Sequence, residues 1–236
     1  MKIGIITALA IESKPLLSQL FGVERQMLGY TQAERGMRNG HSMHVITAGV
    51  GKVAASMATQ LLIDTVKPDV LLNLGVAGAL QDDLSTGDVV IGKQLIQHDV
   101  VGAPKFGRAP GELPFVGDLS FPMADEATVN ALLASSTDDV NLVLGNILSG
   151  DEPVFDDSRK SELVKTFSHF NPLAVDMESA AFAYVAAING VPFGVVRAIS
   201  DRASKSDQNI FSAEMMNAMT APEHGAVVIS AFIDRI

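Results

Sequence analysis

The hydrophobic positions of this chain fall into short continuous runs that alternate with longer, periodic ones. Six continuous apolar runs predict strands, and their continuity indicates strands that are covered on both faces. These runs span residues 2–9, 43–50, 69–74, 88–97, 140–148 and 193–200. Helices are predicted between and after them, over residues 11–20, 53–66, 125–134, 157–170, 178–189 and 224–235.

The predicted helix over residues 53–66 shows the helical spacing most clearly. Its apolar positions are Ala54, Met57, Leu61, Leu62 and Val66, close to one every 3.6 residues. Alternation of such helices with buried strands favours a mostly parallel sheet between layers of helices. The pattern therefore predicts an α/β fold.

One long stretch, residues 100–122, has neither periodicity and is rich in Gly and Pro. A loop of this length inside a compact domain is usually functional or lies at an interface. We therefore expect this segment to take part in the site or in contacts with another chain.

Length and composition limit the classes of protein to consider. A chain of 236 residues with 47% hydrophobic residues can form one domain, residues 1–236, around one sheet. A net charge of −10 argues against nucleic acid or an anionic membrane surface as a partner. The absence of cysteine excludes disulfides and thiolate chemistry. No apolar run approaches the ~20 residues of a membrane span, and the start reads as a strand rather than a signal peptide. We expect a cytoplasmic protein.

Carboxylates stand where predicted strands end and predicted helices begin. Glu12 follows the first strand, Glu178 opens a helix, and Asp201 follows an apolar run that contains Arg197. Such places are where α/β proteins position their chemistry. A structural role is the alternative for each: Glu12 and Glu178 favour the positive end of a helix, and Asp201 is a good helix N-cap.

At this point the sequence resembles a known family. The run AVDMESAAFAYVAAINGVPFGVVRAISD, residues 174–201, is similar to the nucleoside phosphorylase/nucleosidase superfamily. Within it the closest likeness is to the bacterial 5'-methylthioadenosine/S-adenosylhomocysteine nucleosidases, and it extends from MKIGII to the last helix. The resemblance implies a single-domain, three-layer fold whose central sheet is mixed, mostly parallel and twisted, with flanking helices.

The resemblance also implies catalytic roles. Glu12 would orient and deprotonate the attacking water, and Arg197 would help to hold that water. Asp201 would hydrogen-bond the exocyclic amine of adenine and give a proton to N7, as a general acid. Burial near a glutamate would favour a protonated Asp201.

Further residues would bind the substrate in this family's manner. Glu178 would accept hydrogen bonds from two vicinal ribose hydroxyls, with Met177 beside it. In the glycine turn that follows a strand, Val76 and Ala77 would lie close to the ligand. The family usually has a serine at position 76, whose hydroxyl helps to fix the water. Val50 would line the pocket for the 5' substituent.

The base-binding segment departs from the family pattern. Ser149-Gly150-Asp151 matches, and Val154 falls where backbone groups grip the purine. Pro153, however, stands where the family has a stacking aromatic residue. Stacking on the base would then fall to Phe155 or Phe211. Phe211 matches the family phenylalanine that packs on the ligand, and Met215 follows one turn later.

The long loop begins at His98-Asp99 and contains Phe106. In the resembling proteins this loop reaches into the neighbouring subunit's site, which implies a homodimer. A structural role is the preferred interpretation of His98. The five histidines have no metal-binding spacing, so neither a metal nor another cofactor is expected. Asp176, where close relatives often have Glu, is expected to support the site rather than to do chemistry.

The favoured function is hydrolysis of the N-glycosidic bond of methylthioadenosine and S-adenosylhomocysteine, with 5'-deoxyadenosine as a further candidate. Three alternatives stay open: phosphorolysis on the same fold, a futalosine-type specificity, and a nucleoside-binding protein with little turnover. Phosphorolysis needs fixed positive charge for phosphate. The phosphorylases carry an arginine ahead of the glycine turn, where this chain has Leu72-Asn73-Leu74.

Overall fold

A computed structural model describes residues 1–29, 31–100, 103–113, 117–204 and 220–236. The strands are β1 (Lys2–Thr7), β2 (Phe21–Leu28), β3 (Thr31–Arg38), β4 (His41–Thr47), β5 (Val70–Ala79), β6 (Val89–Gln97), β7 (Leu142–Ser149), β8 (Pro172–Asp176) and β9 (Phe193–Asp201). The α-helices are α1 (Ala10–Leu17), α2 (Lys52–Val66), α3 (Glu126–Leu133), α4 (Asp157–Thr166), α5 (Ser179–Ile188) and α6 (Ala221–Arg235). Single 3₁₀ turns occur at Ala103–Phe106, Gly117–Ser120 and Ser168–Phe170.

Each strand and helix predicted from the hydrophobic pattern is present, with shifted ends. The helix predicted over residues 157–170 is wrong at its end, because Phe167 leaves the helical conformation (φ −103°, ψ 21°) and buries its ring. Three strands were missed. The hairpin of β2 and β3 has few buried positions and hence no clear alternation, and β8 is only five residues long and begins with proline.

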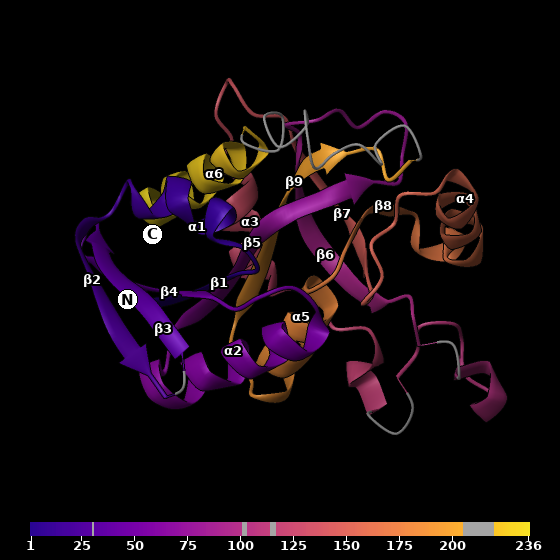
Figure 1. Cartoon of the computed structure of the whole chain (residues 1–236), viewed down its shortest axis with the longest axis horizontal. Helices are drawn as coiled ribbons and strands as arrows, with labels where there is room; N and C mark the ends of the chain where they lie inside the picture. The colour runs from indigo at the N-terminus through magenta and orange to yellow at the C-terminus, as the bar shows by residue number, and fades with distance from the viewer. Residues whose placement is uncertain (30, 101–102, 114–116, 205–219) are drawn as a thin grey trace.

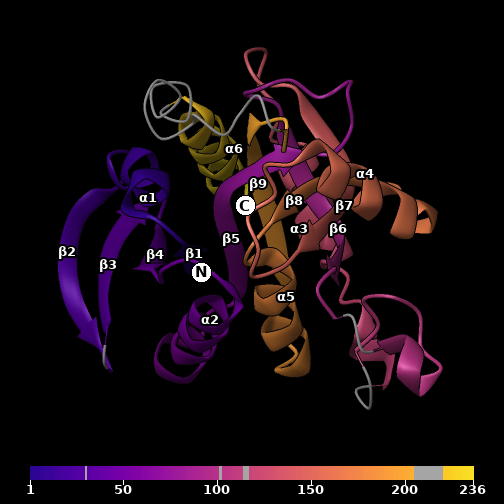
Figure 2. The same cartoon turned by 45° about the vertical axis from the view of Figure 1, so that its right-hand side comes forward.

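The sheet is mixed, as expected, and it also closes on itself. From one edge the order is β2-β3-β4-β1-β5-β8-β7-β6-β9, and β9 pairs in turn with β5. Strands β5, β9, β6, β7 and β8 therefore form a ring, while β1 to β4 extend from it as an open sheet (Figures 1 and 2). Five of the strand pairs are parallel (β1–β4, β1–β5, β5–β9, β6–β7 and β7–β8).

Strand β5 belongs to both parts of the sheet. It pairs with β1 only from Val70 to Asn73, and then continues alongside β9 until Gly78 and Ala79 reach β8. The last half of β5 thus diverges from β1. This divergence leaves room beside Gly75 at the carboxyl ends of the strands, where open α/β sheets bind ligands.

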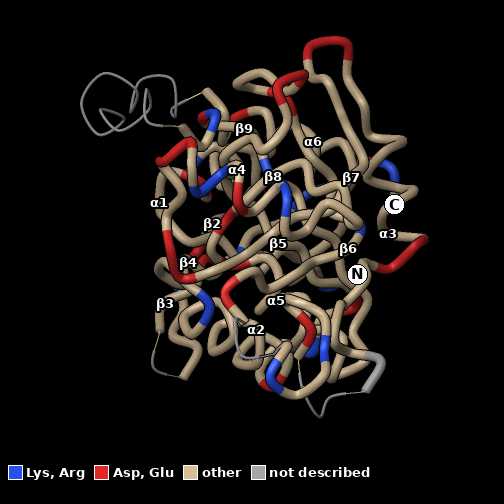
Figure 3. The backbone as a smooth tube through the Cα atoms, turned by 90° about the vertical axis from the view of Figure 1, so that its right-hand side faces the viewer, with Lys and Arg blue, Asp and Glu red and all other residues tan. Residues whose placement is uncertain are grey.

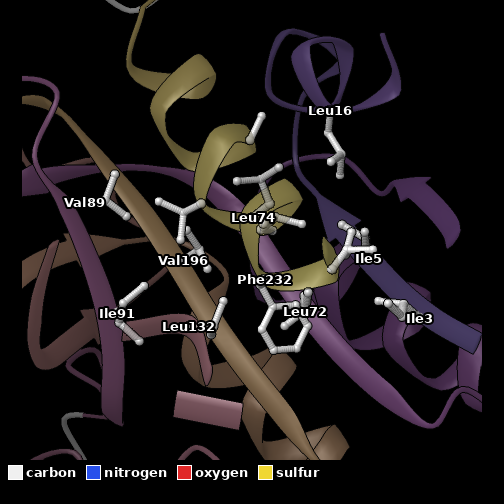
Figure 4. Close-up of a cluster of buried hydrophobic side chains, with 14 of the residues drawn as sticks. Ile3, Ile5, Leu16, Leu72, Leu74, Val89, Ile91, Leu132, Val196 and Phe232 are labelled. Carbon is white, nitrogen blue, oxygen red and sulfur yellow. The ribbon is translucent and has the colours of Figure 1, made fainter. Parts of the chain in front are cut away.

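Two layers of helices bury the sheet. Helices α1, α3 and α6 cover one face, with Leu16, Leu132 and Phe232 in the core drawn in Figure 4. Helices α2 and α5 cover the other face through residues such as Leu62 and Phe182. The predicted α/β fold with a mixed sheet between helices is confirmed.

Surface charge follows the acidic composition. In the view of Figure 3, lysines and arginines lie scattered among the acidic residues over several elements. Within the described ranges, no helix has the length and hydrophobicity needed to cross a bilayer.

Candidate active site

The site lies where the ends of β1, β4, β5, β8 and β9 meet. The loop after β1 leads into α1 with Glu12, and Glu178 follows β8 at the start of α5. Arg197 and Asp201 both belong to β9. The structure brings Glu12, Glu178 and Arg197 together as buried groups, with exposed fractions of 3%, 7% and 1%.

Glu12 is held by backbone groups on both carboxylate oxygens. Its Oε2 accepts hydrogen bonds from the N–H groups of Ala8 and Leu9, each 2.8 Å long. Its Oε1 accepts one from the N–H of Val76, at 3.1 Å. Burial raises the pKa of Glu12 above its ordinary value, although Arg197 and these N–H groups oppose the rise. The carboxylate therefore caps its own helix and is held in one orientation.

Arg197 is fixed by two side chains from neighbouring strands. Its Nε donates to Asp176 Oδ2 and its Nη2 donates to Asn73 Oδ1, each at 2.5 Å. Asn73 in turn donates to the carbonyl of Ile6. Burial by itself would lower the pKa of Arg197, but the carboxylates of Asp176, Glu178 and Glu12 raise it. The guanidinium therefore stays charged and keeps one orientation.

The remaining nitrogen of Arg197 faces the same spot as Glu12. A Cβ added to Gly75 would lie 2.7 Å from Arg197 Nη1 and 2.9 Å from Glu12 Oε1. Nη1 is buried and has no hydrogen-bond partner in the described part of the chain. Because a buried guanidinium N–H without a partner is costly, a polar atom placed between the two groups, accepting from Arg197 Nη1 and donating to Glu12 Oε1, would satisfy it.

Glu178 lies between this spot and the start of α2. Its Oε1 accepts a 2.8 Å hydrogen bond from the N–H of Gly51, and its Oε2 lies 3.9 Å from Arg197 Nη2. Burial, followed by the nearby charge of Asp176, raises the pKa of Glu178 to about 7. The adjacent Met177 is half-buried.

Asp176 supports the site, as its position suggested. Its carboxylate accepts from Ser149 Oγ at 2.5 Å, from Ser179 Oγ and from Arg197 Nε. The backbone N–H groups of Glu178 and Ser179 also point at it. Asp176 thereby ties β7, β8, β9 and the start of α5 together.

Asp201 is the last residue of β9 and is paired with Gly78 of β5. Its Oδ1 accepts from the N–H of Ala203 and its Oδ2 from Ser200 Oγ, each at 2.7 Å. A Cβ at Gly78 would lie 2.9 Å from Oδ1, so the glycine makes room for this carboxylate. Asp201 is half-buried. Its protonation at neutral pH stays a prediction.

Residues 75–78 were expected to form a turn after the strand, but they lie within β5, where they remain paired with β9. They act on the site through their backbone. Val76 contributes its N–H to Glu12, and its side chain packs against the core instead of offering a hydroxyl. Ala77 is buried, with its carbonyl 3.3 Å from Ser200 Oγ.

The base-binding segment is anchored on both sides. Val154 is buried with Phe167 in a separate apolar cluster. Arg159 of α4 makes a bidentate contact with Glu152, at 2.9 and 3.0 Å. Pro153 is exposed and Phe155 half-buried. Phe211 and Met215 lie outside the described residues.

The residues expected to bind the 5' substituent are open to solvent in the single chain. Val50 is 52% exposed and Phe106 is 61% exposed. Val50 lines a hollow of about 320 Å³ together with Val53 and Met57 of α2 and Ile46 of β4.

Two groups at the site were missed from sequence. Asn73 was noted only because it is not an arginine. The sequence Ala48-Gly49-Val50-Gly51-Lys52 is similar to a phosphate-binding loop but fails its pattern, so Lys52 was given no role. A buried amide within an apolar strand is a signal that could have identified Asn73, since such a group needs partners.

Comparison with known proteins identifies the family of the chain. A family model described as the phosphorylase superfamily matches residues 2–234. The chain belongs to the phosphorylase superfamily.

Three members of the superfamily illustrate the likeness. A 5'-methylthioadenosine/S-adenosylhomocysteine nucleosidase of Geobacillus kaustophilus is 34% identical over 236 residues, covering 99% of this chain and 97% of the relative. The structure of the nucleosidase of that name from S. pneumoniae, with the transition-state inhibitor MT-ImmA, has a TM-score of 0.88 and 32% identity, covering 99% of each chain. The futalosine hydrolase of Helicobacter pylori has a TM-score of 0.89 and 30% identity, covering 100% and 98%.

Proposed function

We propose that this chain hydrolyses the N-glycosidic bond of 5'-methylthioadenosine and S-adenosylhomocysteine, and serves methionine salvage in the cytoplasm. The observation that carries the proposal is the convergence of Glu12 Oε1 and Arg197 Nη1 on one spot beside Glu178. The similar nucleosidases at 32–34% identity support the substrate class.

Water is the nucleophile in this proposal. It lies between the two side chains near Gly75, accepts a hydrogen bond from Arg197 Nη1 and donates one to Glu12 Oε1. The water oxygen forms the new bond to C1' of the ribose while its proton passes to Glu12. The serine hydroxyl usual in the family is not required, because Arg197 is already fixed by Asp176 and Asn73.

Asp201 serves the leaving group. As the bond between C1' and N9 breaks, its electron pair goes to the purine, and Asp201 supplies a proton to N7. Adenine therefore leaves as a neutral molecule. General acid catalysis of this kind contributes typically 10²–10⁴-fold.

Glu178 binds the ribose hydroxyls next to Met177 and opposes the positive charge that develops on the ring. Transition-state charge of this sort is stabilised by groups that are already oriented. The hydrogen bond from Gly51 supplies such orientation for Glu178.

Phosphorolysis is disfavoured by charge. A phosphate ion placed beside Gly75 would meet the carboxylates of Glu12 and Glu178, with the single guanidinium of Arg197 already bound to Asp176. The repulsion between phosphate and these carboxylates costs electrostatic energy, whereas a neutral water molecule meets no such repulsion.

We further infer a homodimer. Val50, Val53 and Met57 are exposed on and before α2, and Phe106 is exposed on the long loop. A second copy would bring its Phe106 loop against this apolar patch and complete the 5' pocket beside Val50. A thioether forms only weak hydrogen bonds. Its binding free energy therefore comes mainly from burial of apolar area, at roughly 25 cal/mol per Å².

The test is to incubate the protein with methylthioadenosine, with and without phosphate, and to identify the sugar. We expect adenine and free methylthioribose at equal rates in both. Formation of a sugar 1-phosphate that requires phosphate would refute hydrolysis. Binding without product would favour the nucleoside-binding alternative.

Futalosine is the second candidate substrate, because the H. pylori futalosine hydrolase matches this fold as well as the nucleosidases do. Parallel assays with both nucleosides distinguish the two. We expect a higher kcat/KM with methylthioadenosine.

A further inference from the structure

The His98-Asp99 pair at the end of β6 has no part in the chemistry above, yet it underlies the base-binding turn. Asp99 Oδ2 accepts a 3.0 Å hydrogen bond from the N–H of Asp151. Its Oδ1 forms a 2.6 Å ion pair with Lys52 Nζ. Lys52 Nζ also donates to Gln97 Oε1 at 3.2 Å.

Asp151 closes this network on the other side. Its Oδ1 accepts a 2.7 Å hydrogen bond from the N–H of Lys52. Lys52, Asp99 and Asp151 thus form a closed triangle, in which each member contacts the other two. We call this set the Lys52 triangle.

The Lys52 triangle lies directly beside the group that is proposed to bind ribose. The N–H of Gly51 binds Glu178, and the N–H of the next residue, Lys52, binds Asp151. Gly51 has a φ of 98°, and a Cβ there would lie 2.9 Å from Asp151 Oδ1. Two consecutive N–H groups at the start of α2 therefore hold the Glu178 carboxylate and the base-binding turn at a set separation.

The side chain of His98 supports the turn by packing, and its backbone N–H donates a 2.9 Å hydrogen bond to the carbonyl of Ser149. A Cβ at Gly150 would lie 2.4 Å from His98 Nε2, so the ring fills the space beneath Gly150. The ring is 4% exposed, and neither of its nitrogens has a hydrogen-bond partner in the described ranges. Burial lowers its pKa, and the neutral ring acts as a packing surface.

Burial by itself would raise the pKa of Asp99, but the hydrogen bonds from Lys52 and Asp151 hold it below its ordinary value. The side chains of Lys52 and Asp99 remain 19% and 24% exposed. Partly exposed ion pairs add little to stability. The triangle is therefore better explained by the geometry it imposes than by stability.

We propose that Lys52, Asp99 and Asp151 are positioning residues that set the base-binding turn, residues 149–154, at the distance from Glu178 that a nucleoside requires. The inference rests on the proposed function. A nucleoside must satisfy the base and ribose sites at once, whereas free adenine needs only the base site. Misplacement of a bound group by about 1 Å can cost on the order of 10²-fold in rate.

The test compares two ligands on Asp99→Asn and Lys52→Met by calorimetry. The first ligand is adenine, and the second is a methylthioadenosine analogue with carbon in place of N7, which cannot accept the proton there. We expect each variant to lose about tenfold or more in affinity for the analogue, and less than about threefold for adenine. Lys52→Arg keeps the cation and should recover most of the loss.

Asp234→Asn is the matched control, since it breaks the 2.5 Å ion pair with Arg38 in a distant, similarly exposed place. It should change neither affinity. Equal losses for both ligands, or no loss for the analogue, would overturn the proposal. If Asp99→Asn fails to fold, Lys52→Met gives the same comparison.

Turnover of the unaltered protein separates the two hypotheses. Hydrolysis by wild type together with unchanged ligand ratios in the variants would refute the positioning role alone. Analogue binding without hydrolysis by wild type would refute the proposed function, and the ligand ratios would still decide the positioning role.

Discussion

Among single residues, the buried charges of the site determine how the protein responds to pH. Glu12, Asp176 and Glu178 surround one guanidinium, that of Arg197. Burial raises the pKa of Glu178 to about 7, from an ordinary value of 4.5. The folded state therefore binds a proton at Glu178 that the unfolded state has released between these pH values.

The sign of the effect follows from linkage. The stability that Glu178 contributes is fully present below about pH 4.5 and is lost as pH rises through about 7. Glu178→Gln removes this dependence. We expect the variant to gain on the order of 1–3 kcal/mol over wild type between about pH 5 and pH 8.5, measured as the difference in unfolding free energy at each pH. A difference that stays constant or shrinks with rising pH would contradict the raised pKa.

Among the elements, β5 determines the catalytic geometry because its glycine leaves the space that Glu12 and Arg197 share. A methyl group at Gly75 would occupy that space. Gly75→Ala should therefore lower kcat with methylthioadenosine by about 10²-fold or more, since both groups must move. Steady-state kinetics together with thermal unfolding provide the measurement.

Gly4→Ala on β1 is the control for crowding in the sheet. Its added Cβ would lie 2.7 Å from a methyl group of Leu71, the same distance as in the site variant, but among apolar side chains. We expect it to lower stability and to leave kcat within about threefold of wild type. A similar loss of kcat in both variants would mean that crowding of β5 itself, and not the water site, is responsible.

On the scale of the whole molecule, we propose that a second copy of the chain completes the site. Val53 is 70% exposed on α2 and lines the hollow beside Val50. Val53→Asp should dissociate the dimer, because a charge would be buried in an apolar contact. Sedimentation should show a monomer, and kcat/KM for methylthioadenosine should fall by about tenfold or more.

Val23→Asp provides the comparison, since Val23 is 42% exposed on the edge strand β2. It should keep the dimer and the activity of wild type. A wild-type monomer with full activity would contradict the shared pocket.

The sequence by itself determined the α/β class, the family, the helices and the buried strands other than β8. Burial on both faces requires continuous apolar runs, and this local requirement can be read directly from residues such as those of β5 and β9. Their positions at strand ends and helix starts made Glu12, Glu178 and Asp201 candidates, and the family resemblance selected them, together with Arg197, over their structural alternatives. Their roles stay predictions.

Only the tertiary structure decided which groups meet. The closure of the sheet depends on β5 pairing with both β8 and β9, a long-range contact that no local pattern contains. In the same way, the orientation of Arg197 depends on Asp176 and Asn73 from two other strands. Contacts between residues far apart in sequence cannot be read from a local pattern, because hydrogen bonds and charge interactions depend on separation in space.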